Sequence, residues 1–309
     1  MKFLVVNGSP KGKYSCTLHT ILYLEKIFKE HTFEVLNVGR NIKALEKDFE
    51  EAKKVLSECD AIIFSYPVYT FIAPSQLHRF IELIKAHNVD LKDKFVTQIT
   101  TSKHFYDMTA HKYIEENCYD LKMKYVKGLS QDMDDLPKKS GQLDAINFFK
   151  FFISSIENDM FEVIPASKEY QLLKYNVSFE KTSKDESKEV VIVSDLCDDD
   201  ENLKNMIEDF RNLLPFKSKV VNIKEFPFSG GCLGCFNCAG DGKCIYKDGF
   251  DNFLRENIQK SDAIVIAFTI KDHSMGARFK MYDDRQFCNG HRTVTEGMPF
   301  GYIVNGDYE

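Results

Sequence analysis

Short runs of apolar residues alternate with longer segments of mixed apolar and polar residues through the first half of the chain. The runs predict strands buried on both faces, and the longer segments have the spacing of amphipathic helices. The predicted strands lie near residues 3–6, 33–38, 61–64, 95–99 and 124–129. The predicted helices lie near residues 17–29, 43–57, 75–86, 109–121 and 142–156. Strands alternating with helices in this way predict an α/β fold with a doubly wound parallel five-stranded sheet.

The pattern starts again after a polar stretch. Residues 180–189 read EKTSKDESKE, and we interpret residues 166–188 as a linker. Beyond it, VVIVSDLC resembles FLVVNGSP of the first strand, and SDAIVIAFTI resembles CDAIIFSYPV of the third. A recurrence of this kind indicates a duplicated domain. We therefore predict a first domain over residues 1–165 and a second of the same type over residues 189–309.

The second copy is longer than the first in one place and shorter in another. Val190 and Asp262 are 72 positions apart, whereas Phe3 and Asp60 are 57 apart, so about 15 residues are inserted. The fourth strand of the copy is predicted near residues 300–304, with no fifth strand or closing helix after it. We expect this domain to lack its C-terminal part. Either the chain is a fragment, or another chain covers the exposed sheet edge; we expect a homo-oligomer.

Composition and charge narrow the class of protein. Of the 309 residues, 28% are charged and 43% are apolar, and the formal net charge is -6. Without a long basic run, nucleic acid is not an expected partner. No apolar run approaches the roughly 20 residues of a membrane span, and the N-terminus does not have the pattern of a signal peptide. We expect a cytoplasmic protein.

Four of the nine cysteines lie in the segment GCLGCFNCAGDGKC, residues 231–244. In a reducing compartment, clustered thiols indicate metal binding or redox chemistry more than disulfides. The spacing C-x2-C-x2-C-x5-C is of the type that holds an iron–sulfur cluster, whereas structural zinc more often separates two C-x2-C pairs by a dozen residues. We predict a [4Fe–4S] cluster; zinc, and free or redox-active thiols, remain alternatives. The predicted ligands are Cys232, Cys235, Cys238 and Cys244.

Four other cysteines are isolated along the chain, and a fifth lies in the loop considered next. We interpret the isolated ones as small buried apolar residues. They are Cys59, Cys118, Cys197 and Cys288.

The segment NGSPKGKYSCT, residues 7–17, follows the first strand and leads into a helix. Its hydroxyl groups, its two lysines and the free N–H groups of the helix start suit a phosphate group. A capped helix after a glycine turn is the structural alternative. Two more loops, YPVYTFIAP at residues 66–74 and TTSKHFYD at residues 100–107, end strands at the same edge of the sheet. Ligands bind at this edge in open α/β folds, so we predict flavin mononucleotide (FMN), with simple loop packing as the alternative.

These motifs resemble those of the flavodoxin-like, NAD(P)H-dependent flavin reductases, including the iron–sulfur flavoproteins of anaerobic microbes. The resemblance implies a flavodoxin-like fold, and it is strongest in the loop at residues 7–17, although the family usually has Asn where this chain has Cys16. It also implies a set of FMN contacts at the phosphate and around the isoalloxazine ring. The residues so implied are Ser9, Ser15, Cys16 and Thr17 for the phosphate loop, and Pro67, Val68, Tyr69, Thr101 and Ser102 for the ring.

The cofactors implied by the resemblance determine the predicted activity. We expect an FMN-dependent oxidoreductase that takes hydride from NAD(P)H and passes electrons to an unknown acceptor, with the cluster as a possible carrier. A non-enzymatic flavodoxin-like electron carrier and a scaffold with a structural zinc site are the alternatives. The second copy has SDLCDDDENL in place of the phosphate loop, and its carboxylates would repel a phosphate; we predict that they cap a helix. Asp284 and Arg285 are predicted to form a structural ion pair.

Overall fold

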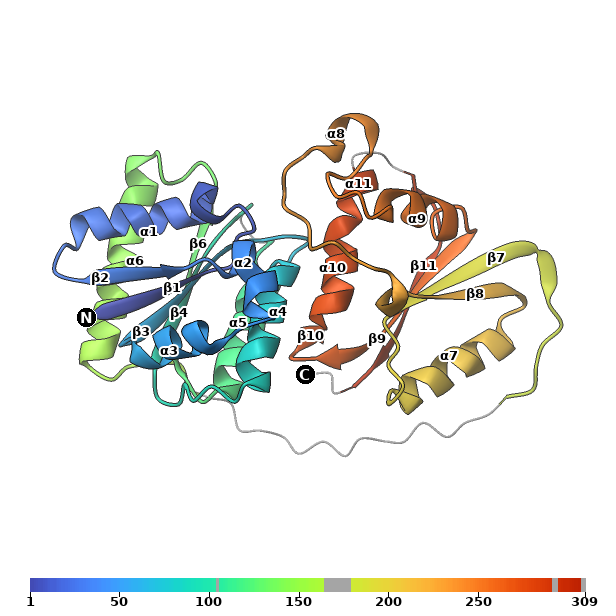
Figure 1. Ribbon diagram of the computed structural model, residues 1–309, viewed down its shortest axis with the longest axis horizontal. Coiled ribbons are helices and arrows are strands. Elements are labelled where there is room, and N and C mark those ends of the chain that lie inside the picture. The colour runs from blue at the N-terminus through green and yellow to red at the C-terminus, as the bar shows by residue number, and fades with distance from the viewer. Residues whose placement is uncertain (104–105, 164–178, 291–293, 307–309) are drawn as a thin grey trace. The chain divides into compact units, whose positions relative to one another are not determined.

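The computed structural model describes residues 1–103, 106–163, 179–290 and 294–306. The chain forms two compact units, unit 1 over Met1–Ala166 and unit 2 over Ser167–Glu309 (Figure 1). Most of the predicted linker lies outside the described residues. Its last ten positions, 179–188, are described, and the final four of them belong to strand β7, which begins at Asp185 and pairs with the strand over Phe216–Asn222.

Unit 1 contains one parallel sheet. Its strands are β1 (Lys2–Asn7), β2 (Thr32–Leu36), β3 (Ala61–Pro67), β4 (Phe95–Ser102), β5 (Lys124–Tyr125) and β6 (Leu129–Asp132). Their order is β2-β1-β3-β4-β5, with β6 also paired to β4. This is the flavodoxin-like order, and the predicted fold class is confirmed. The predicted fifth strand is divided in two at Gly128, where a Cβ atom would lie 2.4 Å from Cγ of Gln98.

The helices of unit 1 follow the strands as the pattern predicts, with one exception. They are α1 (Cys16–Ile27), α2 (Val38–Leu45), α3 (Glu50–Glu58), α4 (Ser75–Ala86), α5 (Met108–Asp120) and α6 (Lys139–Glu157). The predicted helix over residues 43–57 is wrong, because α2 begins earlier and α3 is separate. The Asp48 carboxylate accepts a hydrogen bond from the N–H of Glu50 at 3.1 Å. A local bond of this kind competes with the helical pattern and divides the two helices.

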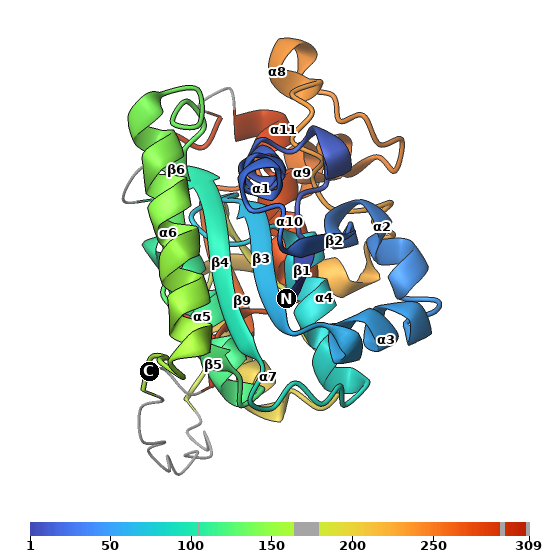
Figure 2. The ribbon, with the colours of Figure 1, turned by 90° about the vertical axis from the view of Figure 1, so that its left-hand side faces the viewer.

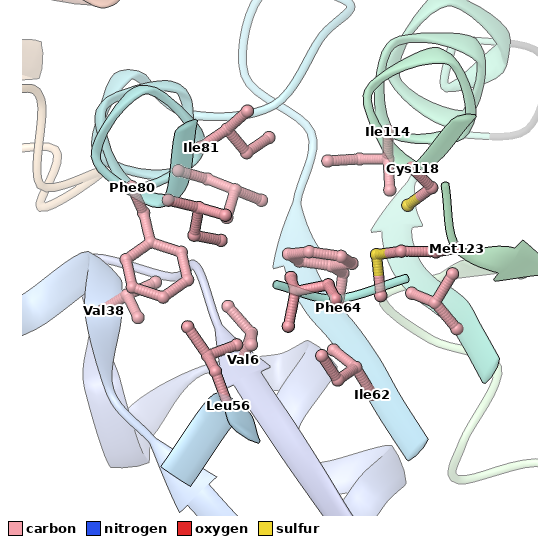
Figure 3. Packing of buried hydrophobic residues seen from close by; sticks show 14 of the residues in the cluster. Val6, Val38, Leu56, Ile62, Phe64, Phe80, Ile81, Ile114, Cys118 and Met123 are labelled. Atoms are coloured by element: carbon pink, nitrogen blue, oxygen red, sulfur yellow. The ribbon is translucent and has the colours of Figure 1, made fainter. Parts of the chain in front are cut away.

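Alternate residues of β1 enter two different cores. Phe3 and Val5 pack on the face that α1 and α6 cover, whereas Leu4 and Val6 pack on the face covered by α2 to α5. Figure 2 shows α6 on one side of β4, with α3 and α4 on the other side of β3. Figure 3 shows the second core around Phe64 and Phe80. Burial of each such side chain contributes about 1.5–3 kcal/mol, so the two layers hold the strand ends, and the loops on them, in fixed positions.

Unit 2 repeats the first part of this architecture. Its strands are β7 (Asp185–Ser194), β8 (Phe216–Asn222), β9 (Ala263–Lys271), β10 (Ser274–Met275) and β11 (Phe300–Asn305). Its helices are α7 (Glu201–Leu213), α8 (Cys238–Asp241), α9 (Phe250–Asn257), α10 (Ala277–Arg285) and α11 (Phe287–Gly290). The parallel strands lie in the order β8-β7-β9-β11, which matches β2-β1-β3-β4 of unit 1. The predicted fourth strand is therefore confirmed as β11.

The thiol segment occupies one connection of unit 2. It lies between β8 and α9, where unit 1 has α2 between β2 and α3. The core beneath it is formed by Val191 and Val193 of β7 with side chains of α9 and α10, including Phe250 and Phe279. The segment thus rests on an apolar base.

In the part of the chain that the structure describes, no helix is long and apolar enough to cross a membrane.

Candidate functional site

Asn7, at the end of β1, organises the loop that follows it. Its side chain is buried and donates to the carbonyl of Gly12 at 3.1 Å and to Oδ1 of Asn37 at 2.9 Å. Its own Oδ1 accepts from the N–H of Ser9 at 3.2 Å. One amide therefore fixes both arms of the loop and ties it to the start of α2. The sequence analysis quoted Asn7 but gave it no role.

The first turn of α2 packs directly on this loop. A Cβ atom on Gly39 would lie 2.3 Å from the carbonyl oxygen of Gly8 and 2.4 Å from the carbonyl carbon of Ser9. Only glycine permits so close an approach of two backbones. The side-chain carbons of Arg40 lie beside Gly12, which has a positive φ of 54°. Sequence reasoning missed these α2 residues, since nothing in the sequence indicates that α2 meets the loop.

Helix α1 begins inside the predicted phosphate loop. Ser15 is its N-cap, and its hydroxyl accepts from the N–H of Leu18 at 3.4 Å. Ser9, Ser15 and Thr17 are buried, whereas Cys16 is exposed. The first-turn N–H groups have no partners within the helix, and the dipole makes this end positive. These features suit an anion, but Ser15 already acts as the cap described by the structural alternative.

Thr101 is the point where the three predicted loops meet. Its hydroxyl lies 2.6 Å from the hydroxyl of Thr17, which ends the predicted phosphate loop and lies in the first turn of α1. Its carbonyl accepts from the N–H of Val68, in the loop after β3, at 3.2 Å. In the paired strands, Pro67 lies opposite Thr101. Hydrogen bonds therefore join the first turn of α1 and the residue after β3 to the end of β4, at one edge of the sheet.

The loop after β3 contains a tight hairpin turn. Tyr69 and Ile72 exchange two backbone hydrogen bonds, at 2.9 and 3.2 Å. Between them Thr70 and Phe71 have positive φ angles of 46° and 67°. This is the two-residue turn that Asn-Gly usually forms. The ring of Phe71 is exposed and lies 5.4 Å, between centroids, from the exposed ring of Tyr106.

The other predicted ring contacts lie on the same rim. Pro67, Val68, Tyr69 and Ser102 are half-buried. The hydroxyl of Ser102 donates to the carbonyl of Lys103 at 2.8 Å. The rim thus combines apolar surface with hydroxyl and backbone polar groups, as a flat heterocycle with polar edges requires.

A buried polar network beneath this rim was not anticipated. The hydroxyl of Thr100 donates to the Asp107 carboxylate at 3.0 Å, so it must accept from Nε2 of His111, which lies at 2.8 Å. Burial lowers the pKa of His111, although the nearby Asp107 opposes this change. The network anchors the start of α5 to the end of β4. A histidine four residues after an aspartate was the signal available in the sequence.

The residues of unit 1 fit a bound FMN in the chemistry of their donors. A helix N-terminus and a loop with two lysines would face the phosphate, and Arg40 adds a third cation beside Gly12. The Ser65 hydroxyl, at the end of β3, is buried and has no hydrogen-bond partner among the described residues. A buried hydroxyl at a ligand-binding edge is a donor available to a polar ligand.

Two of the four thiols of residues 231–244 contact the chain at the end of α10: the sulfur of Cys244 accepts from Nη2 of Arg285 at 3.4 Å, and the thiol of Cys238 donates to the carbonyl of Phe287 at 3.6 Å. Cys235 is exposed, and Cys232, Cys238 and Cys244 are half-buried. Burial raises the pKa of Cys232 to about 11, although a hydrogen bond from the N–H of Gly234 opposes this. Burial also raises the pKa of Cys238. Without a metal these two thiols are protonated at neutral pH, and a metal would have to displace their protons.

The spacing of the sulfur atoms bears on the kind of metal. Among the described residues, one group of His, Cys, Asp or Glu ligand atoms lies within 4.8 Å of one another, and it is Cys197, Asp199 and Asp200. The four thiols form no such group. Tetrahedral zinc at about 2.3 Å from each sulfur would hold the sulfurs about 3.8 Å apart. The described positions of the thiols therefore do not bring three of their sulfurs to the spacing that zinc requires.

A buried ion pair lies under the thiol segment. Arg285, the last residue of α10, contacts both carboxylate oxygens of Asp248, at 2.5 and 2.8 Å. Asp248 also accepts from the N–H of Ser229 at 2.8 Å. Burial opposes the ionisation of Asp248, but these hydrogen bonds outweigh it and lower its pKa to about 2.

The predicted pairing of Asp284 with Arg285 is wrong. Asp284 instead pairs with Lys280, one helical turn earlier on α10, at 2.5 Å. Both side chains are completely buried. Neighbouring residues of a helix point in different directions, so Asp284 and Arg285 reach different partners.

One expectation about the isolated cysteines needs correction. Cys59, Cys118 and Cys288 are buried as expected, but Cys197 is only half-buried, since it lies in a loop near Lys271. The carbonyl of Cys288 lies beside Gly242 of the thiol segment.

The acidic loop after β7 does not cap α7 as predicted. Asp200 is at the N-cap position, but its carboxylate accepts from the N–H of Cys197 at 2.9 Å and from no N–H of the helix. The loop closes on itself and places its carboxylates where unit 1 has hydroxyls and lysines.

Comparison with known proteins agrees with this geometry. Residues 1–130 match the family model of NADPH-dependent FMN reductases. An iron–sulfur flavoprotein of Archaeoglobus fulgidus is 33% identical over 73 residues, which are 24% of this chain and 33% of that protein. An iron–sulfur flavoprotein of Clostridioides difficile is 30% identical over 87 residues, 27% of this chain and 37% of that protein. The chain therefore spans about a third of the length of these relatives.

Several solved structures are also similar to part of the chain. An NADPH-quinone reductase from P. pentosaceus has 17% identity and a TM-score of 0.40, covering 49% of this chain and 97% of that one. An FMN-dependent NADH-azoreductase from Bacillus anthracis, solved with FMN, has 15% identity and a TM-score of 0.35, covering 52% and 99%. The family match of residues 1–130 is independent of these values. Over this segment the chain is similar to the NADPH-dependent FMN reductase family, and the two iron–sulfur flavoproteins are similar to part of it.

Proposed function

We propose that this chain is an FMN-dependent oxidoreductase that takes hydride from NAD(P)H and passes electrons to an acceptor. The observation that carries the proposal is the junction at Thr101, which joins three loops at the ligand-binding edge of a segment that matches the FMN reductase family. When bound, FMN supplies two-electron acceptance from a nicotinamide and electron release in single steps.

In this proposal the loop after β1 binds the phosphate. The N–H groups at the start of α1 donate to it, and Ser9, Ser15, Cys16 and Thr17 surround it. The fixed position of the loop, set by Asn7, means that little ordering is required on binding. Lys11, Lys13 and Arg40 balance the phosphate charge.

The rim residues orient the ring of the flavin. Pro67, Val68 and Tyr69 offer the apolar surface of one wall, and Thr101 and Ser102 offer polar atoms beside it. The exposed apolar side chains on this rim would provide a surface beside the flavin ring, on which a nicotinamide could stack. The preference for NADH or NADPH is not part of the proposal.

We further propose that Cys232, Cys235, Cys238 and Cys244 hold a [4Fe–4S] cluster as an electron carrier. The C-x2-C-x2-C-x5-C spacing in the sequence and the apolar base formed by Phe250 and Phe279 support it. Two iron–sulfur flavoproteins among the relatives support it as well.

The flavin site is tested with Ser9→Asp in the full chain. A carboxylate at this buried position would oppose the phosphate by several kcal/mol if desolvated, so FMN binding should fall at least a hundredfold. Ser57→Asp, at an exposed position near the end of α3, adds the same charge away from the loop and should leave binding unchanged. Flavin fluorescence titration measures both.

Two further measurements separate the activity from its alternatives. Bleaching of the flavin absorbance by NADPH or NADH, with continuous turnover when an acceptor is added, supports an enzyme. A chain that binds FMN but never oxidises a nicotinamide is an electron carrier instead. For the thiols, iron and sulfide analysis after anaerobic reconstitution supports the cluster, whereas zinc alone contradicts it.

A further inference from the structure

Arg285 is a large cationic side chain with no access to water. None of its side-chain surface is exposed, and that of Asp248, its partner, is 3% exposed. Ion pairs that are fully desolvated contribute little to stability, and apolar residues of similar volume often serve as well. The burial of this guanidinium therefore requires a reason beyond the pairing itself.

The guanidinium contacts the thiol segment at both of its ends. Nη1 donates to the carbonyl of Gly230, two residues before Cys232, at 3.3 Å. Nη2 donates to the sulfur of Cys244, the last of the four thiols, at 3.4 Å. The chain between these two contacts carries the remaining cysteines. One side chain on α10 thus fixes where the segment begins and where it ends.

Three aromatic rings enclose the guanidinium. Its Cζ lies 4.7 Å from the ring centroid of Phe250, 4.8 Å from that of Tyr246 and 5.7 Å from that of Phe228. The hydroxyl of Tyr246 in turn donates to the carbonyl of Gly231 at 3.1 Å. Rings at these distances favour a cation and exclude water. A hydrogen bond in such surroundings is stronger than one in water.

The guanidinium also retains an unused donor. Its Nε is buried and has no hydrogen-bond partner among the described residues. Asp248 takes up the charge of Arg285, but it does not use every N–H group. An iron–sulfur cluster brings sulfur acceptors to such a donor. The guanidinium of Arg285 can therefore donate to one more acceptor than the described residues supply.

We propose that Arg285 is a positioning residue for the thiol site: it orients Cys244, and its hydrogen bond to that sulfur raises the reduction potential of the metal group held there. This inference rests on the proposed cluster. A donor to a ligating sulfur stabilises the more negatively charged, reduced state, and such donors tune both affinity and potential. No proton transfer by Arg285 is involved.

Arg285→Lys tests the proposal in the full-length chain, reconstituted anaerobically with iron and sulfide. Lysine keeps the charge but lacks the planar fork that reaches Asp248 and Cys244 together. Arg255→Lys is the matched control, because Arg255 donates to the carbonyl of Gly242, at 3.3 Å, and to other oxygens, but to no sulfur. Circular dichroism and thermal melting check the fold, and Arg285→Gln replaces Arg285→Lys if the latter does not fold.

The readouts are iron and sulfide per chain and the midpoint potential of the cluster, followed by its visible and electron paramagnetic resonance spectra. We expect a shift to lower potential, or a tenfold or greater loss of bound iron, in Arg285→Lys only. A folded Arg285 variant with the iron content and potential of the wild type overturns the role of Arg285 alone. A wild-type chain that takes up no iron and sulfide overturns the cluster proposal and this inference with it.

Discussion

Helices α4 and α10 occupy the same place in two sheets of the same order, each leading away from the third parallel strand. Both bury apolar side chains, but α10 also buries charged ones. Helix α4 packs on its sheet with Leu77, Phe80 and Ile81, all almost fully buried. Helix α10 buries Lys280 and Arg285 together with their carboxylate partners. The fold requires only that this position be filled. The kind of side chain buried there depends on the connection after the second strand of each sheet. That connection is an ordinary helix, α2, in unit 1 and the thiol segment in unit 2.

The largest expected effect comes from removing a buried charge of α10, a kind of group that α4 does not bury. Lys280→Met removes the ammonium that pairs with Asp284 and should destabilise unit 2 by about 3–5 kcal/mol, because the carboxylate remains buried. Adding Asp284→Leu should recover most of that loss. Urea unfolding followed by circular dichroism measures both. A single variant that costs less than about 1 kcal/mol contradicts the importance of this pair.

The next effect concerns the backbone contact between α2 and the phosphate loop of unit 1. Gly39→Ala should destabilise unit 1 by about 1–3 kcal/mol through overpacking, although alanine is the better helix former. FMN affinity should fall at least tenfold because the loop is displaced.

Gly301→Ala, in unit 2, is the control for Gly39→Ala. There the nearest atom to the added methyl would be Cγ2 of Val265 at 3.7 Å, an ordinary contact, and little change is expected. Equal effects of the two substitutions would show that the crowding at Gly39 is unimportant.

A smaller effect tests the junction of the three loops. Thr17→Val and Thr101→Val each remove one hydroxyl of the 2.6 Å pair, and each leaves the other hydroxyl without this partner. A double-mutant cycle on the free energy of unfolding should give a coupling energy of about 0.5–1.5 kcal/mol. FMN titration of the same variants shows whether the junction also serves the ligand. Strictly additive losses would mean that the two hydroxyls act separately.

The smallest effect is a pH dependence expected of unit 1. Because burial lowers the pKa of His111 below its unfolded value of about 6.5, the unfolded state takes up this proton first as the pH falls. The contribution of His111 to stability is therefore full above pH 6.5 and declines below it. Thermal melting of the wild type should show this decline as the pH falls below about 6.5, and His111→Gln should reduce it. An unchanged pH profile in the variant assigns the decline to other groups.

The periodicity of apolar residues was sufficient to predict most of the fold, because each strand of unit 1 is a continuous buried run. It failed at the division between α2 and α3, where the local bond to Asp48 ends the helical pattern. It also failed at the start of α2 and in the divided fifth strand, where Gly39 and Gly128 make close contacts. Such contacts join residues far apart in the sequence and leave no periodic signal. Even so, the duplicated motifs predicted β11, because the fourth strand of the first copy has a counterpart in the second. In the structure β11 pairs with β9 as β4 pairs with β3.

The candidate sites were predictable as segments but not as networks. Hydroxyl and thiol residues at characteristic spacings indicate a binding site directly in the sequence. The loop at residues 7–17 and the four cysteines could therefore be found. The residues that organise them, Asn7 and Arg285, have common side chains in ordinary surroundings of sequence. Their roles come from partners 30 and 41 positions away, Asn37 and Cys244, which only the folded chain brings together.

The hairpin turn at Tyr69–Ile72 has a consequence for protein engineering. Thr70 and Phe71 occupy backbone angles that branched and aromatic residues adopt only with strain, of order 1–3 kcal/mol each. An Asn-Gly pair would relieve that strain but would also remove the aromatic side chain from the rim. This rim is therefore a place where thermostability and ligand recognition would have to be optimised against each other.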